Sequence, residues 1–507
     1  MILGDFGGSE PMTERTAVNA TLDDLFRGAL ARRPDAIALA DPADRADFTD
    51  GAARRLTYAE ADRAITALAA RLRAFGLPTD SVVAIQLPNT VESVIALLAV
   101  MRAGLIAAPL PQLWRHADAA TALSRVAART LICCQRVGDT VHGDLAMHIA
   151  METFTIRFLC GFGTDLPDGV VPIDDIFSSH DEPPAIERAG TAADHVALVT
   201  FDVTADGIVP VARSHAELLV AGLAVTLEAA IAPHTALLGA LAPGSFAGIA
   251  TTVVPWLLSG GTLVLHQPFA PEVFARQHAD ERCTVAVLPG PMVTRLADAR
   301  LLDGTTALAV WRAPERMPAS AASRGTLIDI PVFGEIGLIA MRRGAHGTPS
   351  AIPAGRRVAH DVHLLTVART PAGTIALSGP MVPKAPFPPG AERGHAPKLK
   401  ITDGAIDTGY SCSIDRMTET LTVNGPPAGI VSIGGYRFAL RALQELIAGI
   451  EDGSTLAALP DVLAGHRLAG SGADRDAICD ALLAHGANPL LVAAFRARRP
   501  STQASAA

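Results

Sequence analysis

The segment that decides the fold runs from residue 197 to residue 219, ALVTFDVTADGIVPVARSHAELL. Its apolar first part predicts a strand, its polar, glycine-containing middle predicts a loop, and a helix is expected to begin at Ser214. Ser214 and Glu217 have the spacing of a capping box, in which each side chain satisfies a backbone N–H group of the other residue. Because a helix N-terminus favours anions, this loop is expected where proteins usually hold phosphate.

Strand and helix alternate along the rest of the chain. Residues 82–87 predict a strand, residues 90–103 a buried helix, and the segment after Gly104 a second strand. This is a βαβ unit, which implies a parallel sheet covered on both faces. The sequence therefore predicts an α/β fold.

Composition indicates a large globular protein. The chain has 507 residues, of which 49% are hydrophobic, and a formal net charge of −9. This length suggests roughly two to four domains. The mild acidity without a long basic run predicts no nucleic-acid partner. The six cysteines lack CxxC spacing, which predicts reduced thiols and no cysteine metal site. The N-terminus lacks a signal-peptide pattern, so we expect a cytoplasmic protein.

Residues 246–265 contain no charged side chain, which raises the alternative of a membrane span. Pro255 and the pair Gly260 and Gly261 argue against it, because these residues interrupt a continuous helix. We expect a buried helix followed by a strand at residues 262–265, and no membrane span.

The central segment also resembles the phosphate loop of the adenylate-forming (ANL) superfamily, which includes AMP-forming acyl-CoA synthetases, peptide-synthetase adenylation domains and luciferases. The usual form of that loop is Thr-Ser-Gly-Thr-Thr-Gly-x-Pro-Lys-Gly. With one extra residue before the proline, the positions kept here are Thr200, Thr204, Gly207, Pro210, Ser214 and His215. By motif position, the resemblance assigns Thr200, Thr204 and Gly207 to nucleotide binding.

The resemblance implies a domain organisation for the whole chain. A loose N-terminus (1–20) precedes a large N-terminal region (21–427) of two doubly wound α/β lobes and a small β-barrel, the barrel at about 340–427. A reduced α+β C-terminal domain (430–507) follows. Residues 437–447 are expected to form a helix within it.

Two further segments resemble nucleotide-site motifs of the superfamily. Phe333, Gly334 and Glu335 resemble a Tyr-Gly-x-Thr-Glu motif, which places the aromatic ring near adenine and the glutamate at Mg²⁺; a surface turn glutamate is the alternative. The segment from Asp403 to Tyr410 resembles Asp-Gly-x-x-x-Thr-Gly-Asp, with Tyr410 in place of the ribose-binding aspartate. Asp407 is the candidate substitute for that aspartate.

Two other resemblances concern the acid and the thiol. Ser245 and Phe246 occupy the position of a Pro-x-Phe-His segment near the acid pocket, and Gly434 and Gly435 resemble the glycine loop near the CoA tunnel. The implied ligands are ATP or AMP, Mg²⁺, CoA, and a small carboxylic acid or acyl thioester.

The departures from these motifs concern groups that handle anions. Val211 replaces the loop lysine, and Asp202 and Asp206 place carboxylates in a loop meant for phosphate. Two like charges about 4 Å apart repel by roughly 4 kcal/mol at an effective dielectric near 20. Lysine occurs only at positions 384, 398 and 400, so the C-terminal lysine of the superfamily has no counterpart. Arg213 is expected to be solvent-exposed at a helix start, with contact to a phosphate as the alternative.

Three functions stay open at this point. The chain is a weak or altered acid–thiol ligase, a non-catalytic protein that binds an acyl or acyl-CoA ligand, or a scaffold that holds a protein partner. We predict that the scaffold is kept while the anion-handling groups are lost. Other cations gathered around the former nucleotide cleft would contradict that prediction.

Overall fold

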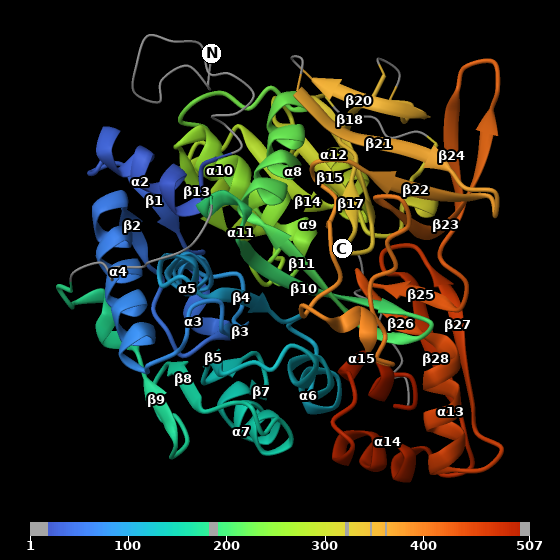
Figure 1. The fold of residues 1–507 in the computed structure, drawn as a ribbon, viewed down its shortest axis with the longest axis horizontal. Helices are drawn as coiled ribbons and strands as arrows, with labels where there is room; N and C mark the ends of the chain where they lie inside the picture. The colour runs from blue at the N-terminus through green and yellow to red at the C-terminus, as the bar shows by residue number, and fades with distance from the viewer. Residues whose placement is uncertain (1–18, 182–190, 320–323, 345–346, 360–361, 497–507) are drawn as a thin grey trace, which may run out of the picture.

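The computed structural model describes residues 19–181, 191–319, 324–344, 347–359 and 362–496 (Figure 1). The described strands form four larger sheets and one small two-stranded sheet. The N-terminus predicted to be loose, residues 1–20, lies almost entirely outside the described residues.

The sheet that contains the central segment has seven strands and is mostly parallel. Its order is β11 (Gly207–Ser214), β10 (Val196–Thr204), β4 (Ile106–Pro109), β3 (Val82–Gln86), β5 (Thr130–Cys134), β8 (Phe158–Phe162) and β9 (Val170–Pro172). Helix α5 (Val91–Arg102) connects β3 to the parallel strand β4, and every residue of α5 is buried. The predicted βαβ unit is therefore confirmed.

A second α/β sheet is built from later strands and from the N-terminal strands of the chain. Its order is β17 (Gly337–Leu338), β16 (Leu327–Phe333), β15 (Thr306–Trp311), β14 (Val285–Pro289), β12 (Ala236–Gly239), β13 (Thr262–Leu265), β1 (Ile37–Ala40) and β2 (Arg55–Thr57), with β18 (Met341–Arg342) also paired to β16. Helix α8 (His215–Glu228) packs against α10 (Val254–Ser259), and α12 (Gly290–Asp298) packs on β14 and β15. The predicted α/β class is confirmed.

The uncharged segment 246–265 is not one continuous helix. It forms α9 (Phe246–Gly248), the π-helical turn η3 (Ile249–Val253), α10 and then strand β13. Gly260 ends α10 in a left-handed conformation (φ 61°), as the glycine pair predicts. In the part of the chain that the structure describes, no helix has both the length and the apolar character needed to cross a bilayer.

Two antiparallel sheets complete the molecule. The six-stranded sheet, at the upper right of Figure 1, has the order β19 (Ile352–Pro353), β24 (Thr420–Gly425), β23 (Ala405–Asp415), β22 (Thr374–Ser378), β21 (Val362–Arg369) and β20 (Gly355–Ala359). The last sheet, at the lower right, has the order β26 (Tyr436–Ala439), β25 (Ile430–Ile433), β28 (Gly465–Ser471) and β27 (Thr455–Asp461).

Helices α13 (Leu440–Ile450) and α14 (Arg475–Ala484) accompany the last sheet. The sheet and these helices share a separate apolar core that includes Ile447, Ile478 and Phe495, which we call the C-terminal unit. The exact domain boundaries stay a prediction, and residues 497–507 lie outside the described part.

The prediction of a loop in the central segment is wrong. Strands β10 and β11 pair antiparallel up to Thr204 and Gly207, so only Ala205 and Asp206 form the turn. The polar residues of this segment are compatible with a loop, but the strand pairing includes them, so the segment forms a hairpin. Strand β11 then runs directly into α8, whose capping box between Ser214 and Glu217 is confirmed by hydrogen bonds of 2.9 and 3.3 Å.

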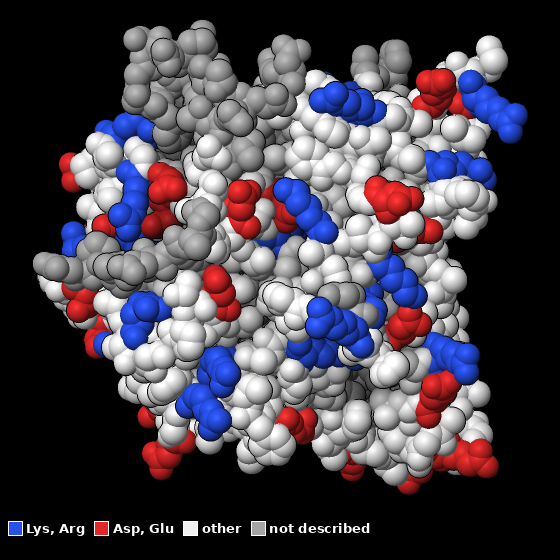
Figure 2. Space-filling model, in the orientation of Figure 1, with Lys and Arg blue, Asp and Glu red and all other residues white. Residues whose placement is uncertain are grey.

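Charged side chains of both signs are scattered over the face shown in Figure 2, and uncharged residues cover most of it. All six cysteines are buried and free of disulfides.

Candidate functional site

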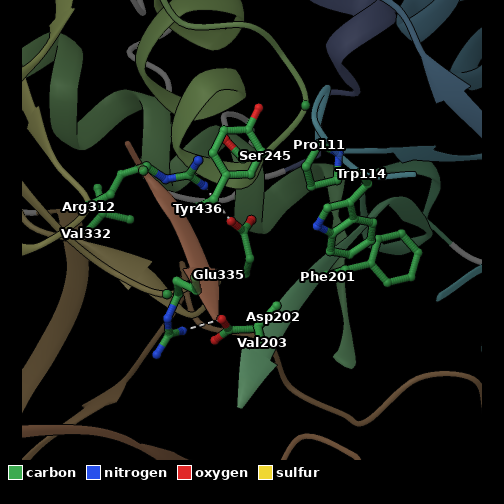
Figure 3. Close-up of a pocket in the computed structure, with 14 residues that line it drawn as sticks. Pro111, Trp114, Phe201, Asp202, Val203, Ser245, Arg312, Val332, Glu335 and Tyr436 are labelled. Carbon is green, nitrogen blue, oxygen red and sulfur yellow. Dashed lines mark hydrogen bonds and ion pairs between the residues drawn. The ribbon is translucent and has the colours of Figure 1, made fainter. Parts of the chain in front are cut away.

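Several of the site residues predicted from the sequence line a narrow cavity (Figure 3). This cavity lies between the β10–β11 hairpin, the end of β16 and the C-terminal unit. Its volume is about 40 Å³. A single water needs roughly 10–15 Å³ of such space, and small-molecule pockets usually measure roughly 300–1,000 Å³. A cavity of about 40 Å³ is therefore large enough for a few waters but too small for a nucleotide.

A salt bridge between distant parts of the chain crosses this cavity. Asp202 on β10 pairs with Arg437 on β26, and both side chains are largely buried. Burial alone would lower the pKa of the Arg437 guanidinium, but Asp202 and Tyr410 beside it raise that pKa above its ordinary value. Gly334 makes room for the pair, because its φ is 59° and a Cβ there would collide with both side chains.

Glu335 lies deeper in the cleft and is fully engaged by protein donors. Its Oε1 accepts from Arg312 Nη2 at 2.8 Å, and its Oε2 accepts from the backbone N–H of Phe246 at 2.7 Å. Figure 3 shows its carboxylate directed towards Arg312, with Tyr436 beside them. Burial raises the pKa of Glu335, and Arg312 and the Phe246 N–H only partly oppose this effect.

The Glu335 carboxylate is held by protein donors, and its predicted role at Mg²⁺ stays a prediction. Both oxygens of Glu335 already accept hydrogen bonds from protein groups. Among the described residues, no group of three or more His, Cys, Asp or Glu side chains could hold a metal ion. The alternative of a surface turn glutamate is wrong, since Glu335 is 6% exposed.

Arg213 is buried, so the expectation that it is solvent-exposed at a helix start is wrong. It is 1% exposed, and its Nη2 donates to the carbonyl oxygens of Glu335 and Ile336 at 2.5 and 2.7 Å. Its guanidinium lies 3.7 Å from the ring centroid of Phe246. Burial lowers the pKa of Arg213 to about 10, although nearby carboxylates oppose the change.

Three arginines therefore gather at the cleft: Arg213, Arg312 and Arg437. This contradicts the expectation that the former nucleotide cleft has no replacement cations. Asp202 and Glu335 pair with Arg437 and Arg312, however, and the buried carboxylate of Glu217 lies close enough to Arg213 to raise its pKa, so each of the three arginines has a carboxylate nearby. Sequence analysis missed Arg437 because it placed this residue in a helix, whereas Tyr436–Ala439 pairs with β25 and the helix begins at Leu440.

The residues predicted to form the phosphate loop are part of the β10–β11 hairpin. Thr200 is buried in the middle of β10, and its Oγ1 has no hydrogen-bond partner among the described residues. Thr204 Oγ1 donates to the carbonyl oxygen of Gly207 at 3.0 Å across the turn. Within the described residues 196–214, the backbone is paired as a hairpin rather than opened as a phosphate loop.

The predicted adenine and ribose residues form an aromatic contact. Phe333 and Tyr410 are buried and pack edge to face, with ring centroids 5.3 Å apart. Burial raises the pKa of Tyr410 to about 12, and its hydroxyl has no partner in the described part of the chain. Asp407 is exposed on the opposite face of β23 and accepts from the N–H of Gly409 at 2.9 Å. The structure therefore does not bring Asp407 to the position of Tyr410.

The remaining predicted residues shape the walls of the cleft. Ser245 caps α9 by accepting from the Gly248 N–H at 3.2 Å. Gly434 and Gly435, with φ of 56° and 86°, turn the chain from β25 into β26. This turn places Tyr436 beside the cavity, where its hydroxyl accepts from the Leu113 N–H at 3.3 Å.

A family model described as AMP-binding enzyme matches residues 26–200. Over these residues the chain is similar to AMP-binding enzymes. A 2-hydroxy-7-methoxy-5-methyl-1-naphthoate–CoA ligase of Streptomyces carzinostaticus is 27% identical over 246 residues, which are 46% of this chain and 44% of that protein. The beauvericin nonribosomal cyclodepsipeptide synthetase BEA1 of Gibberella fujikuroi is 31% identical over 114 residues, 22% of this chain and 3% of that protein. The chain thus aligns with only a small part of such large synthetases.

Solved structures show the same fold over nearly the whole chain. The artificially fused adenylation–PCP di-domain NpsA-ThdA from Klebsiella oxytoca has a TM-score of 0.66 at 17% identity, covering 93% of this chain and 92% of that chain. The amide bond synthetase McbA from Marinactinospora thermotolerans has a TM-score of 0.67 at 16% identity, covering 93% and 94%. These likenesses confirm the predicted adenylate-forming fold.

Proposed function

We propose that this chain keeps the adenylate-forming scaffold but has lost ATP-dependent carboxylate activation. The buried salt bridge between Asp202 and Arg437, inside a cavity of about 40 Å³, is the observation that supports this most strongly. ATP, Mg²⁺ and CoA belong to the activity that the family implies, and the proposal is that this cleft no longer uses them.

Phosphate entry would require Arg437 to leave Asp202. The Asp202 carboxylate would then lie unpaired beside a polyanion, although Asp202 is only 4% exposed. Leaving one charge of a buried pair without its partner costs about 3–5 kcal/mol, before the repulsion by phosphate is added. The free energy of nucleotide binding would have to exceed this penalty.

The remaining groups do not offset the penalty. Adenylation brings a carboxylate to a phosphate, so an active site needs cations that are free to face both anions. Arg312 is paired with Glu335, and Arg213 donates to two backbone carbonyls. The hydrophobic contact between Phe333 and Tyr410 offers no carboxylate for a ribose.

Thermal-shift titration and pyrophosphate exchange test the proposal on the full chain. Ligands that bind the folded state raise the unfolding temperature. We expect millimolar MgATP or AMP to leave that temperature unchanged, and we expect no acid-dependent exchange of pyrophosphate into ATP with a panel of carboxylic acids. An active acyl-CoA synthetase serves as the positive control.

Two variants sharpen the result. Arg437→Ala removes the cleft arginine that pairs with Asp202, and Arg441→Ala removes an arginine from the exposed face of α13, where its side chain is 89% exposed. We expect neither variant to respond to MgATP. If the wild type responded to MgATP or exchanged pyrophosphate, the proposed loss of activity would be wrong.

A further inference from the structure

The strand β27 of the C-terminal unit ends its sheet with an open edge. One side of its backbone pairs with β28, and among the described residues no strand pairs with the other side. In Figure 1, β27 runs along the right-hand side of the C-terminal unit. The edge of a strand presents a row of backbone N–H and C=O groups, which is a template for pairing with another extended chain.

The inner face of β27 fixes the strand in an extended conformation. Leu456 is buried and belongs to the apolar core of the C-terminal unit, and α13 packs against the strand. The outer face carries Thr455, Ala457 and Leu459, and all three side chains are exposed to solvent. The edge is therefore held in place by the core while its outer face stays accessible.

The other described sheet edges are protected against pairing with a second chain. Charged side chains, very short edge strands and burial are the usual devices. Strand β20 carries Arg356 and Arg357, and β2 carries Arg55. Strand β11 is almost entirely buried, and β26 lies against β10. The remaining edge strands of the described chain have at most three residues.

Most of β27 lacks such protection. The strand has seven residues, and the segment 455–463, TLAALPDVL, contains no lysine or arginine. Pro460, which has no N–H group, and Asp461 lie at its C-terminal end, so residues 455–459 stay open to pairing. Three exposed apolar side chains gather at that end: Leu459 (37% exposed), Val462 (89%) and Leu463 (40%). An open backbone edge beside exposed apolar side chains favours contact with another chain.

We propose that two copies of this chain associate through β27, paired antiparallel about a two-fold axis at Ala457. The sequence of residues 455–459, TLAAL, is complementary to itself in this register. Each leucine faces a smaller side chain of the second copy, because Leu459 faces Thr455 and Leu456 faces Ala458, while Ala457 faces its own copy. No like charges face each other over these five residues.

This pairing explains why the partner is a second copy and why the assembly is closed. The two sheets become one continuous sheet, and both open edges are used, so no further copy can add. The contact is small, below the roughly 1,200 Å² of a stable interface, so we expect a weak dimer with a Kd of about 10–500 µM. The proposal goes beyond the loss of activity in the cleft and does not depend on it.

Sedimentation velocity of the full chain, from about 5 to about 500 µM and without nucleotide, tests the dimer. We expect the mass to rise from monomer towards dimer, and amide exchange in β27 to be slower at the high concentration. Ala457→Lys places two cations face to face at the axis and should weaken association by about tenfold or more. Ala457→Glu should do the same with two anions. An equimolar mixture of the two variants should dimerise at least as tightly as the wild type, because lysine then faces glutamate.

Matched controls separate the strand edge from other surfaces. Met417→Lys adds the same charge at the turn between β23 and β24, where Met417 is 92% exposed, and should associate as the wild type does. Val462→Lys changes the turn between β27 and β28 but leaves residues 455–459 intact, so it should weaken association by at most about threefold. Unchanged unfolding temperatures of the dilute variants show that they fold.

Three results would overturn the proposal. The chain would stay monomeric up to about 500 µM, Ala457→Lys would dimerise as the wild type does, or the mixture of Ala457→Lys and Ala457→Glu would not restore association. Strong protection of β27 from amide exchange in the dilute monomer would also contradict it, because another segment of the same chain would then cover the edge. Since these measurements contain no nucleotide, an active cleft would not alter their outcome.

Discussion

Glu335 is a carboxylate whose surroundings only partly support its charge. Burial raises its pKa above the ordinary value of 4.5 in the folded chain. The folded state therefore binds a proton more tightly than the unfolded state, and this group lowers the free energy of unfolding as pH rises above 4.5. Below that pH both states are protonated and the contribution vanishes.

Glu335→Gln should remove this pH dependence. The variant keeps an acceptor for the Phe246 N–H but carries no charge at any pH. We expect the difference in free energy of unfolding, variant minus wild type, to increase as pH rises from 4.5 towards 7, measured by denaturant titration. Glu445→Gln, at a 63% exposed side chain on α13, is the control and should show no such trend. A difference that decreased with pH would mean that Arg312 outweighs burial.

Sequence analysis predicted the place of Glu335 at the cleft but not the contacts of Arg213 and Arg437. Glu335 was placed at the cleft by its motif, and the structure puts it there. The partners of Arg213 and Arg437 lie 122 and 235 positions away in the chain, at Glu335 and Asp202. No local pattern encodes a contact over such a separation, so both arginines were misjudged.

The β10–β11 hairpin replaces the loop that the sequence predicted, and Gly207 tests it. Gly207 has φ of 116°, and a Cβ there would meet no atom closer than 3.6 Å. Gly207→Ala should therefore act through backbone strain alone and lower the free energy of unfolding by about 1–3 kcal/mol. Denaturant unfolding followed by circular dichroism measures this change.

A second glycine provides a control of opposite sign. Gly449 lies on the exposed side of α13, and a Cβ there meets nothing within 4 Å. Gly449→Ala should raise the free energy of unfolding by roughly 0.5–1 kcal/mol, because alanine favours the helix. If Gly207→Ala were neutral or stabilising, the turn would not have the tight geometry described.

Elements were predictable where their signals are local. The capping box of Ser214 and Glu217 depends on residues three apart, and it was correct. The hairpin depends on Phe201 facing Pro210 and Thr204 facing Gly207, a pairing that polarity does not reveal. Polar residues and glycine favour a loop in any single-sequence analysis, and strand pairing overrode them here.

At the scale of the whole molecule, the alternation of strands and helices along the sequence was sufficient to predict the α/β fold class. The resemblance to the superfamily predicted the order of the domains along the chain. Neither could predict how the C-terminal unit lies against the rest. That placement depends on a few side chains, above all Arg437, which reaches from β26 to Asp202 on β10. Figure 1 shows the tip of the green hairpin beside the red strands of the C-terminal unit.

The salt bridge should hold the C-terminal unit closed. Among the described residues, Arg316 Nη2 also lies 2.5 Å from His466 Nε2 across the two parts, and the Ala117 N–H donates to the Gly486 carbonyl at 3.4 Å; neither of these contacts pairs two opposite charges. Arg437→Met would leave Asp202 buried and unpaired, which penalises the closed arrangement by about 3–5 kcal/mol. We expect a larger radius of gyration by small-angle X-ray scattering and faster amide exchange in β10.

A double variant separates charge from packing in this closure. Asp202→Leu combined with Arg437→Met removes both charges, so the closed arrangement no longer buries an unpaired group, and the radius of gyration should return towards the wild-type value. Arg441→Met, at a solvent-exposed pair on α13, should leave scattering and exchange unchanged. If Arg437→Met scattered like the wild type, packing around Tyr436 rather than the ion pair would be what keeps the unit in place.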